Sequence, residues 1–264
     1  MTTSDPTGMH DWHSLQYVED WIASSVQRDE TRRLILRRVA SLIPRTPDAA
    51  LRVLDVGCGY GALSAQVLDL FPQAVVVGQD FSEPMFAHAR ERLAWASPRV
   101  SFTHSDLSDA SWTLALEGPF DAVVSAIAIH NVRYPERIRA IYGEIFGLVA
   151  PSGCFFNYDL IFPSGPAAID AYQRAKSREE WIRMPHGDAR LADTITPQTH
   201  AHTGSNQPRH GHHEGVRSAR GIGSASLEQQ LHWLREAGFE DVECFWKEMQ
   251  SAIIGGFRSA SVST

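Results

Sequence analysis

The spacing of hydrophobic positions changes once along the chain, near residue 48. From Asp11 to Ile43, apolar side chains recur at intervals of three and four residues, which is the period of an amphipathic helix. Pro44 and Pro47 end this pattern, and the first ten residues are polar. We therefore predict an N-terminal helical extension over residues 1–47.

Beyond residue 48, short apolar runs alternate with helical patterns. One predicted helix begins at Glu83, with Ser82 as its N-cap and Pro84 in its first turn. Because parallel strands need crossover connections, this alternation predicts an α/β fold with a doubly wound, mostly parallel sheet that is buried on both faces. The runs that predict strands lie at residues 52–56, 74–79, 100–103, 120–125 and 154–160.

The C-terminal part follows a different order. An amphipathic helical pattern over residues 227–237 closes at Gly238, and two adjacent strand patterns follow at residues 239–247 and 251–258. A terminal hairpin of this kind would add antiparallel strands to the sheet. We therefore predict a seven-stranded sheet with a C-terminal antiparallel hairpin, in a Rossmann-like domain over residues 48–264.

An insertion at about residues 163–225 separates the fifth strand from the C-terminal helix. From Thr196 to Gly215 it has no Val, Ile, Leu, Met or aromatic residue, so we predict a flexible surface loop. Three aromatic residues lie between the fifth strand and this loop, namely Phe162, Tyr172 and Trp181. They could form the wall of an acceptor site or pack in the core.

The same loop has closely spaced histidines, and imidazole is a common ligand of zinc, copper and nickel. These histidines are His200, His202, His210, His212 and His213. No cysteine or carboxylate pattern completes a site with them. We expect only weak, incidental metal binding there and no resident metal.

The charge and the cysteine content limit the compartments and the classes of partner that we expect for this protein. The formal charge is −7, with 24 basic against 31 acidic residues, so no nucleic acid or membrane partner is expected. Three widely spaced cysteines favour a reducing compartment, and we see no signal peptide, so we expect a cytoplasmic protein. Nothing in the sequence indicates an oligomeric state.

The segment VLDVGCGYGA at residues 53–62 is the most informative in the chain. It turns from a strand into a helix through the residues Gly57, Cys58, Gly59 and Gly61. Glycine lets the backbone approach a ligand closely at the carboxyl edge of the sheet. With Ala62 the turn also satisfies the dinucleotide pattern GxGxxA, so an NAD(P)-linked oxidoreductase is an alternative.

Acidic residues lie at the ends of the first three predicted strands. Asp55 would repel a pyrophosphate but would stabilise the ammonium group of an amino acid. Asp80 can accept hydrogen bonds from both hydroxyls of a ribose, and Asp106 can accept one from an adenine amino group. Phe81 and Leu107 could then sandwich or edge the purine. Each acid alone could be a helix cap or a turn residue, but the ordered set predicts a cofactor site.

These segments together resemble the motif series of class I methyltransferases. The series is VLDVGCGYG, QDFSEPM, SDL, PFDAVVSAIAIHNV and a helix that ends in LVAPSG, over about residues 51–159. The tail LHWLREAGFEDVECFWK with IIGGF is similar to the closing helix and hairpin of that superfamily. The sequence departs from the pattern at Ser152, where many members have a glycine, and this should affect only a turn.

The resemblance implies a Rossmann-like fold and S-adenosyl-L-methionine as the cofactor. It implies cofactor-binding roles for Asp55, the turn glycines, Asp80 and Asp106, and we add Ala126 at the end of the fourth strand. The expected activity is methyl transfer to an unidentified small-molecule acceptor. The alternatives are the NAD(P)-linked oxidoreductase and a non-catalytic cofactor-binding partner subunit.

Two residues near the carboxyl ends of the fourth and fifth strands are candidates for catalysis. A base is needed only if the acceptor arrives protonated, because the methyl group of a sulfonium is already electrophilic. His130 follows the fourth strand and Asp159 ends the fifth. Either residue could instead be structural, His130 by bonding a loop carbonyl and Asp159 as a helix cap.

Overall fold

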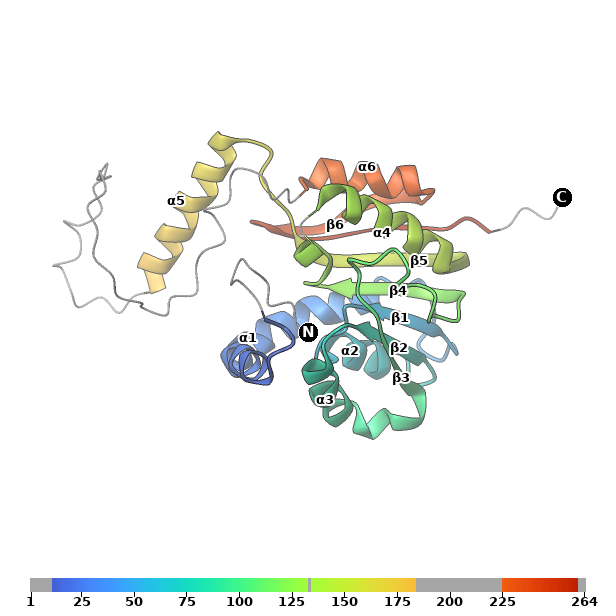
Figure 1. The fold of residues 1–264 in the computed structure, drawn as a ribbon. Coiled ribbons are helices and arrows are strands. Elements are labelled where there is room, and N and C mark those ends of the chain that lie inside the picture. The colour runs from blue at the N-terminus through green and yellow to red at the C-terminus, as the bar shows by residue number, and fades with distance from the viewer. Residues whose placement is uncertain (1–10, 133, 184–224, 261–264) are drawn as a thin grey trace. The chain divides into compact units, whose positions relative to one another are not determined.

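The computed structural model describes residues 11–132, 134–183 and 225–260 (Figure 1). Contacts divide the chain into two compact units. One comprises Met1–Phe162 with Gly223–Thr264 and contains the sheet, and the other comprises Pro163–Ile222 and contains helix α5 (Pro166–Arg183). The predicted histidine-rich loop at residues 196–215 lies outside the described residues.

The sheet has seven strands, as predicted, and their order is β3-β2-β1-β4-β5-β7-β6. Strands β1 to β5 pair in parallel, whereas β7 pairs antiparallel with both β5 and β6. The predicted C-terminal hairpin is thereby confirmed. The strands are β1 Arg52–Val56, β2 Val75–Asp80, β3 Val100–His104, β4 Phe120–Ala126, β5 Val149–Leu160, β6 Glu240–Glu248 and β7 Ser251–Phe257.

Helices cover both faces of the sheet, and each face has its own hydrophobic core. Neighbouring strand residues such as Val53 and Leu54 are both fully buried but belong to different cores, because successive side chains of a strand point to opposite faces. Helices α4 (Pro135–Leu148) and α6 (Leu227–Ala237) pack on one face, and α1 (Leu15–Ser41) and α2 (Ala62–Leu70) pack on the other (Figure 1). This double burial explains the continuous apolar runs in the sequence.

Capping side chains mark the residues at which several helices begin. The Ser82 hydroxyl accepts a hydrogen bond from the Met85 N–H, so Ser82 caps helix α3 (Glu83–Arg92) as predicted. Ser226 forms a reciprocal capping box with Gln229 at the start of α6. The N-terminal helical pattern is also confirmed, with the side chain of Ser14 as the N-cap of α1.

The strand β5 begins earlier than the sequence pattern indicates. It starts at Val149 rather than residue 154, and its pairing with β4 shifts register between Phe120 and Ala122. Ser152 lies in this irregular stretch with φ 61°, a left-handed conformation that favours glycine. The predicted effect of Ser152 is therefore a local backbone strain in the turn that leads into the paired part of β5.

The hydrophobic pattern does not predict helix α5. Its sequence, PAAIDAYQRAKSREEWIR, is mostly polar, and none of its side chains from residue 166 to residue 178 is fully buried. A helix without a buried apolar face gives no periodic signal. Within the described residues, no helix is long and apolar enough to cross a membrane.

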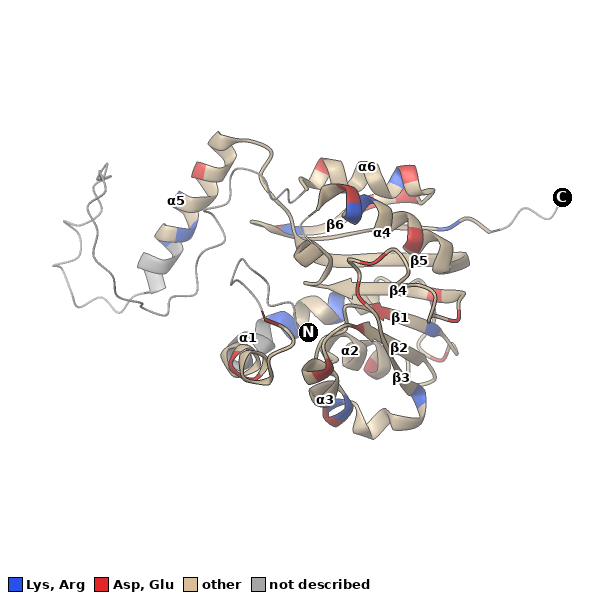
Figure 2. Ribbon diagram, viewed as in Figure 1, with Lys and Arg blue, Asp and Glu red and all other residues tan. Residues whose placement is uncertain are grey.

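Basic and acidic residues both occur along the helices around the sheet (Figure 2). Three arginines of α1 contact other side chains. The Arg37 guanidinium forms an ion pair with Asp69, while Arg32 and Arg38 lie over the rings of Trp21 and Trp246.

Candidate active site

A cavity of about 430 Å³ opens at the carboxyl ends of the parallel strands. Its floor comes from the strand ends and from the turn between β1 and α2, and its cover comes from α1 and the segment before it. Ligands of open α/β sheets bind at this edge, beside the point where the strand order reverses. Of the ten predicted cofactor-binding residues, Gly61 does not line the cavity. The other nine do, and they are Asp55, Gly57, Cys58, Gly59, Asp80, Phe81, Asp106, Leu107 and Ala126.

The glycine turn has the left-handed backbone that its composition predicts. The φ angles of Gly57, Gly59 and Gly61 are 64°, 50° and 76°. A Cβ atom on Gly57 would lie 2.3 Å from the Cβ of Ala128, in the loop after β4. Glycine is therefore required at position 57 both for its conformation and for this close approach.

Asp55 places a buried carboxylate with one unsatisfied oxygen at the cavity wall. The side chain is 1% exposed, and its Oδ2 accepts a hydrogen bond from the Ser64 hydroxyl at 2.6 Å. Its Oδ1 is buried and has no partner among the described residues. Burial raises the pKa of Asp55 to about 7. A ligand ammonium would satisfy the free oxygen and favour the charged carboxylate, so this group fits the amino-acid end of S-adenosylmethionine.

Backbone N–H groups hold the carboxylate of Asp80. Its Oδ2 accepts from Gly59 at 2.8 Å, and its Oδ1 accepts from Phe81 at 2.8 Å and from Ser82 at 3.0 Å. Burial raises the pKa of this carboxyl, and the three N–H groups oppose that rise. Asp80 thus ties the glycine turn to the end of β2 while it faces the cavity.

The loop after β3 forms another wall of the cavity. Asp106 is exposed and accepts a hydrogen bond from the Ser108 N–H at 2.8 Å, while Leu107 is buried. The Arg137 side chain donates to the Leu107 carbonyl at 2.7 Å and so fixes the loop against α4. Phe81 lies across the cavity wall in edge contact with the His13 ring, at 5.2 Å between centroids. A carboxylate that can accept a hydrogen bond, placed beside apolar side chains, suits a purine.

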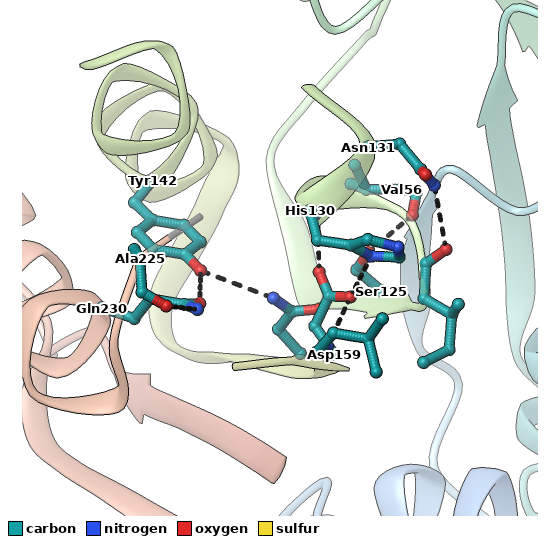
Figure 3. A network of polar contacts seen from close by, with 11 residues as sticks. Val56, Ser125, His130, Asn131, Tyr142, Asp159, Ala225 and Gln230 are labelled. Atoms are coloured by element: carbon teal, nitrogen blue, oxygen red, sulfur yellow. Dashed lines mark hydrogen bonds and ion pairs between the residues drawn. The ribbon is translucent and has the colours of Figure 1, made fainter. Parts of the chain in front are cut away.

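His130 and Asp159, the predicted catalytic residues, contact each other closely (Figure 3). The ring Nδ1 of His130 lies 2.5 Å from Asp159 Oδ1, and the His130 N–H donates to Asp159 Oδ2 at 3.0 Å. Neither side chain lines the cavity, although the neighbouring residues Ala128 and Asn131 do. Their catalytic roles stay predictions.

The sequence analysis missed the cover of the cavity and, among its wall residues, Gln79 and Ile127. Trp12, Trp21 and Arg32 reach it from the N-terminal part of the chain, which the sequence pattern marks only as helical. Gln79 lines it from β2, where a polar residue inside an apolar run was the available signal. Ile127 also lines the cavity, with φ 54°, a strained conformation for a β-branched residue.

Within the described residues, no group of three or more His, Cys, Asp or Glu side chains could hold a metal ion. The three cysteines Cys58, Cys154 and Cys244 are free thiols.

The sequence is similar to known methyltransferases over about half of its length. Residues 53–153 match the methyltransferase domain family. The chain is 36% identical over 135 residues to a trans-aconitate 2-methyltransferase of Variovorax paradoxus, over 51% of this chain and 48% of that protein. It is 31% identical over 163 residues to a demethylmenaquinone methyltransferase of Clavibacter sepedonicus, over 59% of this chain and 63% of that protein. The chain thus spans about half the length of the trans-aconitate relatives it matches.

Solved structures share the fold at low sequence identity. An O-methyltransferase family protein from Burkholderia thailandensis aligns over 95% of this chain and 62% of its own, with a TM-score of 0.62 and 17% identity. Human N-acetylserotonin methyltransferase in complex with SAM aligns over 94% and 58%, with a TM-score of 0.56 and 13% identity. Residues 53–153 therefore match a methyltransferase domain, and they lie in a Rossmann-like fold that solved methyltransferase structures share.

Proposed function

We propose that this protein transfers a methyl group from S-adenosylmethionine to a small-molecule acceptor. The observation that carries the proposal is Asp55, a buried carboxylate with one free oxygen beside the glycine turn. A nicotinamide dinucleotide would bring its negatively charged pyrophosphate to this turn, whereas S-adenosylmethionine brings an ammonium group. The charge of Asp55 therefore favours the methyl donor over the oxidoreductase alternative.

The residues of the cavity then divide between the ends of the cofactor. Asp55 and the glycine turn would hold the amino-acid end, Asp80 the ribose, and Asp106 with Phe81, Leu107 and Ala126 the adenine. When bound, the cofactor supplies an electrophilic methyl group on a sulfonium. The protein needs mainly to orient the acceptor in line with that group and to exclude water, and the cover of Trp12 and Trp21 suits this task.

The cover of the cavity carries a positive charge, which suits an anionic acceptor. Arg32 lines the cavity, and its guanidinium lies over the Trp21 ring at 5.6 Å. No described carboxylate forms an ion pair with Arg32. A carboxylate acceptor would satisfy this guanidinium, and its oxygen needs no base before it attacks the methyl group. Trans-aconitate, which gives several relatives their name, has this chemistry and is the first acceptor to test.

His130 and Asp159 are our candidates for acid–base catalysis on an acceptor that arrives protonated. Asp159 at Nδ1 would hold the ring so that Nε2 can exchange a proton. Because neither side chain lines the cavity, this role depends on how the acceptor reaches them.

Calorimetric titration with S-adenosylhomocysteine, and separately with NAD and NADP, tests the cofactor. We expect S-adenosylhomocysteine to bind with micromolar affinity and NAD and NADP not to bind. Asp80→Ala should weaken the binding of S-adenosylhomocysteine more than tenfold, about 1.4 kcal/mol. Binding of a nicotinamide cofactor would overturn the proposal. Methyl transfer to trans-aconitate then tests the acceptor, and Arg32→Gln should raise the KM for it about tenfold while it leaves the Kd for S-adenosylhomocysteine unchanged.

A further inference from the structure

Gln79 is a buried polar residue near the end of β2, directly before Asp80. Its side chain is 1% exposed and lines the cavity. The amide oxygen Oε1 accepts a hydrogen bond from the Gly57 N–H at 3.1 Å, and the amide nitrogen Nε2 donates to the Ser105 carbonyl at 2.6 Å. One side chain thus contacts two loops that lie 48 positions apart in the sequence, on either side of β2.

The neutral amide of Gln79 meets two demands at once. The Gly57 N–H needs an acceptor and the Ser105 carbonyl needs a donor, and a neutral amide provides one of each. A glutamate at this position would retain the acceptor and, when ionised, lose the donor. An apolar residue of similar size would leave both backbone groups without a partner in a buried place.

The backbone of β2 adds to the same connection. The Gln79 carbonyl accepts from the Cys58 N–H at 2.9 Å, and the Asp80 carbonyl accepts from the Ser105 N–H at 3.0 Å. The two loops that Gln79 joins are the ones assigned above to opposite ends of the cofactor. The glycine turn begins at Gly57, and Asp106 follows Ser105 directly.

We propose that Gln79 is a positioning residue that couples these two loops, so that the amino-acid end and the adenine end of the cofactor site keep one arrangement. The proposal rests on the proposed function for the identity of the cofactor, but the coupling itself is a property of the unliganded protein. When Gln79 is removed, the glycine turn and the Ser105 loop should loosen together.

A second buried glutamine provides a matched control. Gln230 in α6 is 5% exposed, accepts a hydrogen bond from the Tyr142 hydroxyl at 2.6 Å and donates to the Ala225 carbonyl at 3.3 Å (Figure 3). It too joins two groups through its amide, but it does not line the cavity. A loss of stability is expected from substitution of either glutamine, whereas an effect on the cofactor site is expected only from Gln79.

The test compares Gln79→Met, Gln79→Glu and Gln230→Met with the wild-type protein. Hydrogen–deuterium exchange of the unliganded proteins, followed in peptides that contain residues 57–61 and 104–108, reports the coupling. Calorimetry with S-adenosylhomocysteine reports the cofactor site. We expect Gln79→Met to accelerate exchange in both peptides and to weaken binding at least tenfold. Gln230→Met should do neither, although it lowers the melting temperature.

The milder variant keeps the test decisive if Gln79→Met does not fold. Gln79→Glu retains an acceptor for Gly57, so we expect faster exchange mainly in the peptide with Ser105, together with weaker binding. Unchanged exchange and affinity in a folded Gln79 variant would overturn the proposal, and so would equal effects from Gln230→Met. If the wild-type protein does not bind S-adenosylhomocysteine, the proposed function fails, and the exchange data alone decide whether Gln79 couples the loops.

Discussion

Asp159 binds His130 through both of its carboxylate oxygens. Oδ1 lies 2.5 Å from the ring Nδ1, and Oδ2 accepts from the backbone N–H of the same histidine at 3.0 Å. This pair fixes the 3-10 helix η2 (Ile129–Val132) to the end of β5. Since Ala128 and Asn131 line the cavity, the contact shapes the cavity wall whether or not His130 exchanges a proton.

Substitution of His130 separates these roles. With a carboxylate acceptor, we expect His130→Gln to change kcat by less than about fivefold, because a general base contributes about 10²- to 10⁴-fold only where a proton must be removed. The measurement is the pH profile of kcat, with Asp159→Asn as the companion variant. A fall of a hundredfold or more, with loss of the pH dependence, would establish His130 as the base and contradict an anionic nucleophile.

The part of the site that could be predicted from sequence lies at the ends of continuous apolar runs. Asp55 lies near the end of β1, Asp80 ends β2 and Asp106 comes two residues after β3. Parallel strands bring these carboxyl ends to one edge of the sheet. The cover by Trp12, Trp21 and Arg32 depends on how α1 crosses the sheet, and no local pattern encodes a contact at that sequence separation. The predicted start of β5 at residue 154 was wrong for a similar reason. The strand begins where Val149 pairs with Phe120 on β4, far away in the sequence.

Two acids of the loop after β3 allow a controlled test of the adenine end. Asp106 and Asp109 are both exposed, and each accepts from an N–H two residues later, Ser108 and Ser111. Asp106 lines the cavity, whereas Asp109 does not. We expect Asp106→Ala to weaken binding of S-adenosylhomocysteine about five- to tenfold in calorimetry. Asp109→Ala should leave it unchanged, and an equal loss in both variants would mean that the loop, not the carboxylate, matters.

Ser152 allows a prediction of stability. Its φ of 61° costs a residue with a Cβ about 1–2 kcal/mol, while glycine gains freedom in the unfolded chain that offsets part of the relief. We therefore expect Ser152→Gly to raise the free energy of unfolding by about 0.5 kcal/mol, or the melting temperature by about 1–2 °C. Ser152→Ala keeps the strain and is the control. A gain from alanine as large as that from glycine would contradict a backbone cause.

Asp55 makes the stability of the unliganded protein depend on pH. Its pKa is about 7 in the folded protein, against about 3.9 in an unfolded chain. Between these values the folded protein holds a proton that the unfolded chain has lost, so this contribution to stability falls as the pH rises from about 4 to 7. Between pH 5 and pH 8, we expect the melting temperature of the Asp55→Asn variant to fall less than that of the wild type. A parallel decline in both proteins would show that Asp55 does not titrate in this range.

The same carboxyl should make cofactor binding depend on pH in the opposite direction. A protonated Asp55 cannot pair with an ammonium group, so the affinity for S-adenosylhomocysteine should fall as the pH decreases below about 7. Binding near neutral pH should then release a proton, which calorimetry in buffers of different ionisation enthalpy detects. Ser64→Ala is the sharpest comparison, because the Ser64 hydroxyl lowers the pKa of Asp55. Its loss should move the decline in affinity to higher pH, and an unshifted profile would place the responsible proton on another group.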